Sequence, residues 1–191
     1  MNGIFQAAAE IQRFFETRQW RFAIIGGLAV LRWGEPFATQ DVDASLLCGF
    51  GNERRYAGEL LVAFPARIED AAQFARINRV ILIRASNGVG VDIALTGLVY
   101  EEELIERSSL FAFAPDVVLR TCSAEDLVIL KAFAGRAKDW AALRGVLLRQ
   151  NDVLDWAYIE ERLMPLCELK GEPKLAEHLR RLRGELQDRI G

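Results

Sequence analysis

Ile24-Ile25-Gly26-Gly27-Leu28-Ala29, followed by Thr39-Gln40-Asp41-Val42-Asp43-Ala44-Ser45, is the stretch of sequence that decides the fold. It predicts an apolar strand that ends at a paired glycine, then a short helix, then a second strand that carries two carboxylates. Because strand side chains alternate between faces, Asp41, Asp43 and Ser45 share one face. Residues two apart in a strand have Cα atoms about 6.6 Å apart, so both carboxylates can reach one hard cation.

Two carboxylates this close need a counter-charge, because their like charges repel each other. Mg²⁺ carrying substrate phosphates is the usual neutraliser of such a pair. The glycines supply the other half of the chemistry, since a backbone without Cβ can approach a phosphate and the next helix offers unpaired N–H donors. A metal on one strand and a phosphate on the neighbouring turn indicate a nucleoside triphosphate.

A third carboxylate lies further along the chain. Residues 79–84 and 89–95 flank Ser86-Asn87-Gly88, which is a hairpin signal. On the second arm Asp92 shares a face with Gly90 and Ala94, two minimal side chains that leave open space beside it. Alone, Asp92 would be read as a solvated edge-strand aspartate; together with Asp41 and Asp43 it favours a converging catalytic cluster.

Composition narrows the setting of this site. The chain has 191 residues, 51% of them apolar, which suits one domain with a helical appendage. A net charge of −3 argues against broad, nonspecific nucleic-acid binding. We expect no signal sequence, and the sequence has no run of about 20 apolar residues that would span a membrane. The three cysteines are far apart, so we expect buried thiols in a reducing cytoplasm.

The hydrophobic periodicity predicts an ordered series of elements. We expect helices at 4–18, 28–32, 53–63, 69–76 and 99–107, strands at 20–25, 41–47, 79–84, 89–95 and 116–120, and an almost wholly helical C-terminal third. The predicted class is α+β (α/β), with a mixed sheet flanked by helices and a helical C-terminal part. The expected domains are 1–121 and 122–191.

These motifs resemble the nucleotidyltransferase fold superfamily, which includes DNA polymerase beta-like enzymes. Its pattern of a glycine turn, an Asp-x-Asp strand and a later carboxylate strand is matched by Gly26-Gly27, Asp41-Val42-Asp43 and Asp92. Within the superfamily the chain looks most like AbiEii-type toxins and their minimal nucleotidyltransferase relatives. The resemblance spans roughly residues 20–145 and rests on three segments: 26–45, 87–93 and 123–134.

The resemblance implies a nucleotidyltransferase-like sheet and a set of site residues. Asp41, Asp43 and Asp92 would bind Mg²⁺ (or Mn²⁺) and carry catalysis, and the nucleotide would be bound by Gly26, Gly27, Thr39, Ser45 and Lys131. Ser45 is read as a hydrogen-bonding support, since no base that would activate it is evident. Two positions depart from the pattern, where relatives carry an arginine at the place of Phe37 and an acidic residue at the place of Ala142.

Lys131 lies in a helix that is apolar nearly all round and begins with the capping pair Ser123 and Asp126. A lysine there usually extends along its own stem to solvent, but the resemblance favours one that reaches a triphosphate. Asp139, two turns on, is expected to pair with Lys131 or Arg136. The last helix carries an apolar stripe that we expect to dock on a helix at 155–169. His178 on that helix is expected to be a solvated surface residue.

Three functions follow. The first is a metal-dependent transfer of a nucleoside monophosphate from a nucleoside triphosphate to an acceptor hydroxyl, with the acceptor a tRNA, a protein or a small molecule. The second places the same chemistry in a toxin–antitoxin or phage-defence system with a partner antitoxin. The third is a noncatalytic nucleotide-binding or protein-interaction module. Turnover of a nucleotide with Mg²⁺ separates the enzyme from the module.

Overall fold

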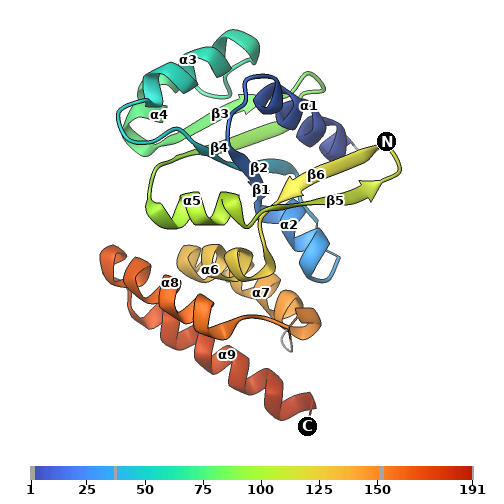
Figure 1. The fold of residues 1–191 in the computed structure, drawn as a ribbon, viewed down its shortest axis with the longest axis vertical. Coiled ribbons are helices and arrows are strands. Elements are labelled where there is room, and N and C mark those ends of the chain that lie inside the picture. The colour runs from blue at the N-terminus through green and yellow to red at the C-terminus, as the bar shows by residue number, and fades with distance from the viewer. Residues whose placement is uncertain (1–2, 37, 151–152, 191) are drawn as a thin grey trace. The chain divides into compact units, whose positions relative to one another are not determined.

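A computed structural model describes residues 3–36, 38–150 and 153–190 of the chain (Figure 1). The chain forms two compact units, one made of Met1–Leu28 and Ala38–Cys122, the other of Ala29–Phe37 and Ser123–Gly191. The boundary passes through helix α2 (Gly26–Trp33). The sequence placed this helix wholly with the N-terminal domain, whereas its second half clusters with the C-terminal helices.

The first unit is built on a six-stranded mixed sheet. Its strands are β1 (Phe22–Ile25), β2 (Asp41–Leu47), β3 (Val80–Arg84), β4 (Gly90–Thr96), β5 (Ser109–Ala114) and β6 (Val117–Thr121). Their order is β3-β4-β2-β1-β6-β5. β2 with β4 and β1 with β6 are parallel, and the other neighbours are antiparallel. The predicted mixed sheet flanked by helices is confirmed.

The two central strands show why the sequence folds in this way. On β2, Val42, Ala44 and Leu46 are fully buried, whereas Asp41 and Asp43 between them are half-buried. The same alternation on β4 buries Val91, Ile93 and Leu95. The aliphatic face of these strands therefore lies in the core, because exchanging the faces would bury carboxylates in place of aliphatic side chains.

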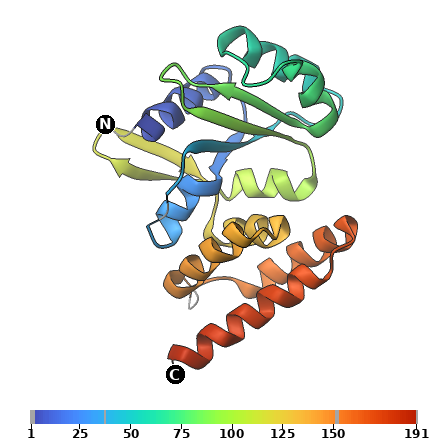
Figure 2. The ribbon, with the colours of Figure 1, turned by 180° about the vertical axis from the view of Figure 1, so that it is seen from behind.

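Helices cover the sheet of the first unit. α1 (Gly3–Thr17) packs against β6 and β2, and α5 (Val99–Glu106) packs against β2 and β1. They lie on opposite sides of the sheet, which can be followed in both views (Figures 1 and 2). α3 (Glu53–Ala63) and α4 (Ala71–Asn78) pack together beside β3. The bounds of these four helices agree with those predicted from the sequence to within about two residues.

Strand β5 is the element that the sequence failed to predict. Its residues Ser109, Leu110, Phe111 and Ala112 are all exposed, so the strand has no alternation between apolar and polar positions. It is an edge strand, paired only with β6 among the described strands. Pairing with β6 through backbone hydrogen bonds, and not a local pattern, makes it a strand.

The second unit is helical, as expected for the C-terminal third. It contains α6 (Ala124–Ala134), α7 (Ala137–Gln150), α8 (Trp156–Lys170) and α9 (Lys174–Ile190). Ser123 caps α6 by accepting a hydrogen bond from the backbone N–H of Asp126 at 3.0 Å, which confirms the predicted start. The second half of α2 belongs here because Arg149 and Gln150 of α7 donate to the carbonyls of Gly34 and Trp33.

The apolar stripe of α9 is covered within this unit. Leu179, Leu182 and Leu186 are buried, and α9 packs against α8 as predicted and also against α6 and α7. Ile190 of the stripe lies among residues whose side chains are not described. The expectation for His178 was wrong. Its ring is half-buried and stacks on Trp140 with the ring centroids 4.0 Å apart.

Candidate functional site

Asp41, Asp43 and Asp92 lie on one face of the first unit's sheet, on neighbouring parallel strands. Asp43 of β2 is directly opposite Asp92 of β4, and Asp41 is opposite Gly90. Residues opposite each other in a ladder point to the same side. The intervening Val42 and Val91 are fully buried on the other face. The alternation read from the sequence therefore places all three carboxylates on the half-exposed face.

A cation already lies between two of these carboxylates. The guanidinium Nη1 of Arg67 donates a short hydrogen bond to Oδ1 of Asp92 and lies 3.8 Å from Oδ1 of Asp41. The side chain of Arg67 is 24% exposed, against 49% for Asp41 and 36% for Asp92. This partly desolvated pairing supplies the counter-charge that two adjacent carboxylates require.

The donor chemistry of this face suits a hard divalent cation. Carboxylate oxygens are the ligands that Mg²⁺ and Mn²⁺ take in proteins. The Arg67 guanidinium lies at the position where Asp41 and Asp92 can both contact one positive charge. The described residues contain no group of three or more His, Cys, Asp or Glu side chains spaced to hold a metal ion. Two of the three aspartates, Asp41 and Asp92, lie against the Arg67 guanidinium.

Gly26 joins strand β1 to helix α2 without an intervening loop. It has a φ of +60°, and an added Cβ would overlap the carboxylate of Asp43. Any L side chain there would be strained by its backbone and would displace Asp43. The carboxylate thus lies beside the first turn of α2, where unpaired N–H groups favour negative charge.

Gly27 makes room for a different side chain. An added Cβ would overlap the hydroxyl and Cβ of Thr39, whose hydroxyl donates to the backbone carbonyl of Asp41 at 3.0 Å. From the sequence, Gly27 is predicted to let a phosphate approach the backbone closely. The structure adds an internal requirement, because Thr39 fills the space and holds the start of β2. The phosphate-binding role of Gly26 and Gly27 stays a prediction.

Ser45 is a supporting residue. It is 3% exposed, and its hydroxyl donates to the hydroxyl of Thr96 at 3.5 Å. This agrees with a hydrogen-bonding support rather than a nucleophile, since a nucleophile must be reached by substrate.

Gly90 corrects one expectation about Asp92. The sequence predicted open space above Gly90 and Ala94, on either side of this aspartate. An added Cβ at Gly90 would overlap the carboxylate of Asp41 and come within 2.7 Å of the Arg67 guanidinium. The space beside Asp92 at Gly90 is therefore filled by an ion pair. No local pattern in the sequence indicates Arg67, because its place follows from the tertiary contacts of residues 65–67 with β3.

Lys131 and Asp139 form an ion pair in the second unit. The Lys131 ammonium lies 2.9 Å from Asp139 Oδ1, and Arg136 Nε lies 2.6 Å from Oδ2. Asp139 is fully buried and the Lys131 side chain is 11% exposed. Burial alone would raise the pKa of the Asp139 carboxyl, but hydrogen bonds from Arg136 and Lys131, with their charges, lower it overall. Asp139 thus pairs with both candidates that the sequence named.

Two positions depart from the nucleotidyltransferase pattern, and the structure describes one of them. Ala142, at a position where relatives carry an acid, is buried in α7. Phe37 lies outside the described residues. A role for Lys131 in nucleotide binding stays a prediction. The thiols of Cys48, Cys122 and Cys167 are buried and form no disulfide, as expected.

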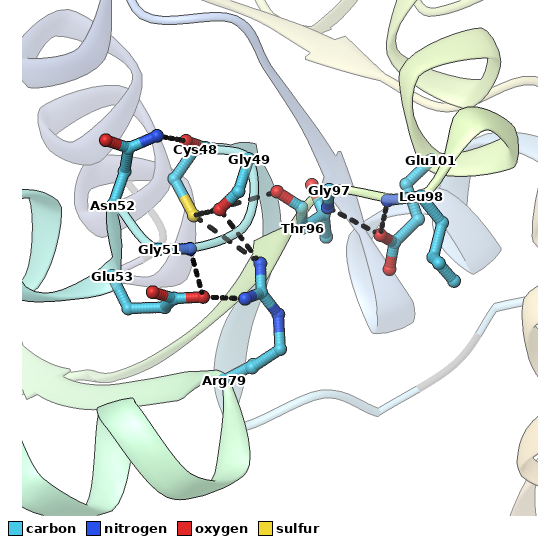
Figure 3. A network of polar contacts seen from close by, with 10 residues as sticks. All are labelled: Cys48, Gly49, Gly51, Asn52, Glu53, Arg79, Thr96, Gly97, Leu98 and Glu101. Carbon is cyan, nitrogen blue, oxygen red and sulfur yellow. Dashed lines mark hydrogen bonds and ion pairs between the residues drawn. The ribbon is translucent and has the colours of Figure 1, made fainter.

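Arg79 holds the end of β2 in place (Figure 3). Its guanidinium pairs with Glu53 and donates to the carbonyl of Gly49 at 3.2 Å. Gly49 N–H in turn donates to the carbonyl of Thr96 at 3.0 Å. Burial raises the pKa of the neighbouring Cys48 thiol, although Arg79 opposes this rise. Arg79 is a structural residue, because its guanidinium donates to Glu53, Cys48 and Gly49.

Comparison with known proteins places the fold. No family model matches the chain, and no curated protein sequence matches it. Among solved structures it is similar to an antigenic nucleotidyltransferase-like protein from Paracoccidioides brasiliensis, with a TM-score of 0.54, 12% identity, and 93% of this chain and 92% of that one covered. The lincomycin-bound lincosamide antibiotic adenylyltransferase LnuA gives a TM-score of 0.49 at 12% identity, over 71% and 91% of the two chains.

A third similar structure is ANT(2")-Ia in complex with adenylyl-2"-tobramycin, with a TM-score of 0.48, 15% identity and 98% of each chain covered. At these identities a likeness shows the fold alone, and of these three structures the first has a TM-score above 0.5. None of the described helices is long and apolar enough to cross a membrane. The six-stranded mixed sheet with its flanking helices thus has the same fold as the protein from Paracoccidioides brasiliensis.

Proposed function

We propose that the chain is a Mg²⁺-dependent (or Mn²⁺-dependent) nucleotidyltransferase that moves a nucleoside monophosphate from a nucleoside triphosphate to an acceptor hydroxyl. The observation that carries the proposal is the placement of Asp41, Asp43 and Asp92 on one half-exposed face, beside the glycine turn that begins α2. A nucleotidyltransferase-like fold in a solved structure supports the same reading.

Each site residue has a defined part in this proposal. Asp41, Asp43 and Asp92 would hold the metal, which when bound neutralises the phosphates and polarises the α-phosphorus. Asp92 takes the proton of the acceptor hydroxyl while the oxygen of that hydroxyl bonds to the α-phosphorus. The bond to the β-phosphate oxygen breaks, and pyrophosphate leaves with the electron pair. The backbone N–H groups at Gly26 and Gly27 bind phosphate oxygens. Thr39 holds the start of β2, and Ser45 links β2 to β4.

The experiment that tests the proposal is a transfer assay with the full chain, Mg²⁺ and each of the four nucleoside triphosphates labelled on the α-phosphate. Total tRNA, protein extract and a small-molecule fraction are offered as separate acceptors. Label that moves to one acceptor with release of pyrophosphate supports the proposal. If no label moves to any acceptor, and calorimetry detects no binding of any triphosphate at millimolar concentration, the chain is not a nucleotidyltransferase.

Lys131 is proposed to contact the triphosphate as a point charge. Lys131→Ala is expected to weaken nucleotide binding by roughly 1.5 to 3 kcal/mol, the scale of a hydrogen bond to a charged group. It should also lower the melting temperature, because buried Asp139 loses a partner. Titration calorimetry with a nonhydrolysable triphosphate measures the first effect.

Asp139→Asn is the matched control for this variant, since it disturbs the same ion pair but keeps the lysine charge. It should retain nucleotide affinity while losing stability. Equal losses of affinity in both variants would assign Lys131 a structural role only.

The biological setting is proposed from the sequence resemblance to AbiEii-type toxins. In that setting the chain acts in the cytoplasm, its transfer activity stops growth, and a partner antitoxin relieves the arrest. Expression of the wild-type chain and of Asp41→Asn in the same host provides the test. Arrest by both variants, or by neither, would contradict a catalytic toxin.

A noncatalytic nucleotide-binding or interaction module of the same fold is the second candidate. The pairing of Arg67 with Asp41 and Asp92 favours it, since these two carboxylates already share one positive charge. The module predicts binding of a nucleoside triphosphate without release of pyrophosphate.

A further inference from the structure

Arg67 reaches the aspartates from a short segment whose backbone is fixed to the sheet. Its N–H donates to the carbonyl of Leu82 at 2.9 Å, and Ala66 forms a bridge with Ile83. Leu82 of β3 is directly opposite Asp92 of β4. The Arg67 backbone thus lies one strand beyond β3, in the same row as Asp92, and its long side chain spans the distance to the carboxylates.

Gly90 is an independent sign that the sheet is built around this pair. Its φ does not lie in the left-handed region, so backbone conformation does not require glycine here. What requires glycine is space, because a Cβ would overlap the Asp41 carboxylate and approach the Arg67 guanidinium at 2.7 Å. The missing side chain lets arginine and aspartate meet directly above the strand.

We propose that Arg67 is the resident counter-cation of the aspartate cluster, and that a divalent metal binds only when it displaces the Arg67 guanidinium from Asp41 and Asp92. This inference rests on the proposed function for the identity of the competing ion. A divalent cation shared by these carboxylates would lie next to the guanidinium, and their like charges repel. Arg67 therefore sets the metal concentration at which the site fills.

The exposure of the Arg67 side chain and the anchoring of its backbone indicate how the metal replaces the guanidinium. The Arg67 side chain is 24% exposed, so solvent reaches the guanidinium and it can swing away without opening the core. Its backbone stays held by Leu82, so it remains near the cluster and returns when the metal leaves. The resting protein thereby avoids leaving Asp41 and Asp92 side by side without a counter-charge.

The test is a direct measurement of Mn²⁺ binding to the full chain without nucleotide, from the signal of free Mn²⁺ in electron paramagnetic resonance. Arg67→Ala is expected to bind Mn²⁺ about tenfold more tightly than the wild type, a difference of about 1.4 kcal/mol. It should also melt at a lower temperature in metal-free buffer, and gain more in melting temperature when Mn²⁺ is added.

Arg84→Ala is the matched control. Arg84 is an exposed arginine on β3, opposite Gly90, and its guanidinium donates to the carbonyl of Gly88. The control removes the same charge from the same region without touching the aspartates. We expect its Mn²⁺ affinity to stay within about twofold of the wild type, since solvent and salt screen an exposed charge.

A second measurement needs only folded wild-type protein. In arginine-labelled protein, the Nε–H resonance of Arg67, assigned by its absence in Arg67→Lys, should shift when Mg²⁺ is added, while that of Arg84 stays unchanged. An unmoved Arg67 resonance, equal Mn²⁺ affinities in wild type and Arg67→Ala, or no Mn²⁺ binding by either would overturn the inference.

The inference and the proposed function can fail separately. Competition between Arg67 and Mn²⁺ without any nucleotidyl transfer would leave the inference standing and remove the function. Nucleotidyl transfer by a protein whose metal affinity does not depend on Arg67 would support the function and overturn the inference.

Discussion

Asp41→Asn is expected to reduce the rate of nucleotidyl transfer on the order of a thousandfold, which corresponds to about 4 kcal/mol of lost transition-state stabilisation. Asp41 lies on the half-exposed face, opposite Gly90, in the group proposed to hold the metal. An amide keeps the shape of the side chain but removes the charge that a hard cation needs. Single-turnover kinetics with labelled triphosphate measure the loss.

The same variant should leave the fold intact. The Asp41 side chain is 49% exposed and lies 3.8 Å from Arg67, so this contact contributes no more than about 1 kcal/mol to stability. We expect a melting temperature within about 4 °C of the wild type. Asp116→Asn, an exposed aspartate between β5 and β6, is the control with the same charge change. Full transfer activity in Asp41→Asn would contradict the assignment of this residue.

The central strands and the face of the carboxylates could be predicted from sequence because their signals are local. β2 begins and ends at the predicted residues 41 and 47, since the alternation of aspartates with aliphatic residues fixes both strand and face. The hairpin of β3 and β4 was predicted from the turn residues Ser86-Asn87-Gly88, and the antiparallel pairing confirms it.

The parallel pairing of β2 with β4 and the place of Arg67 could not be predicted in this way. Each depends on contacts between residues far apart in sequence, and no periodicity in the segment around Arg67 records its contact with Leu82. The start of α2 was placed two residues late, because glycine is a poor helix former whereas Gly26 here begins the helix directly after β1. Local propensity was overridden there by the requirement that Asp43 and Thr39 fit against the glycines.

The pair formed by Asp139 and Lys131 is the feature on which the second unit depends most. Asp139→Asn leaves the Lys131 ammonium, 11% exposed, without its anionic partner. Removing one partner of a buried pair costs about 3 to 5 kcal/mol, and the open position of Arg136 together with the retained amide oxygen reduces this to about 2 to 3 kcal/mol. For a chain of this size the melting temperature should fall by about 5 to 10 °C.

The loss of stability in Asp139→Asn should depend on pH, in a direction that follows from the lowered pKa of Asp139. Because the pKa of Asp139 is lower in the folded than in the unfolded chain, its stabilisation is fully present above the unfolded pKa and is lost as pH falls through the folded pKa. Melting curves of wild type and Asp139→Asn should therefore differ most at neutral pH and converge in acid. Glu177→Gln, which removes an exposed charge from α9, should show no such convergence. A gap between wild type and Asp139→Asn that stays constant into acid would mean that packing, and not the charge of Asp139, stabilises α6 against α7.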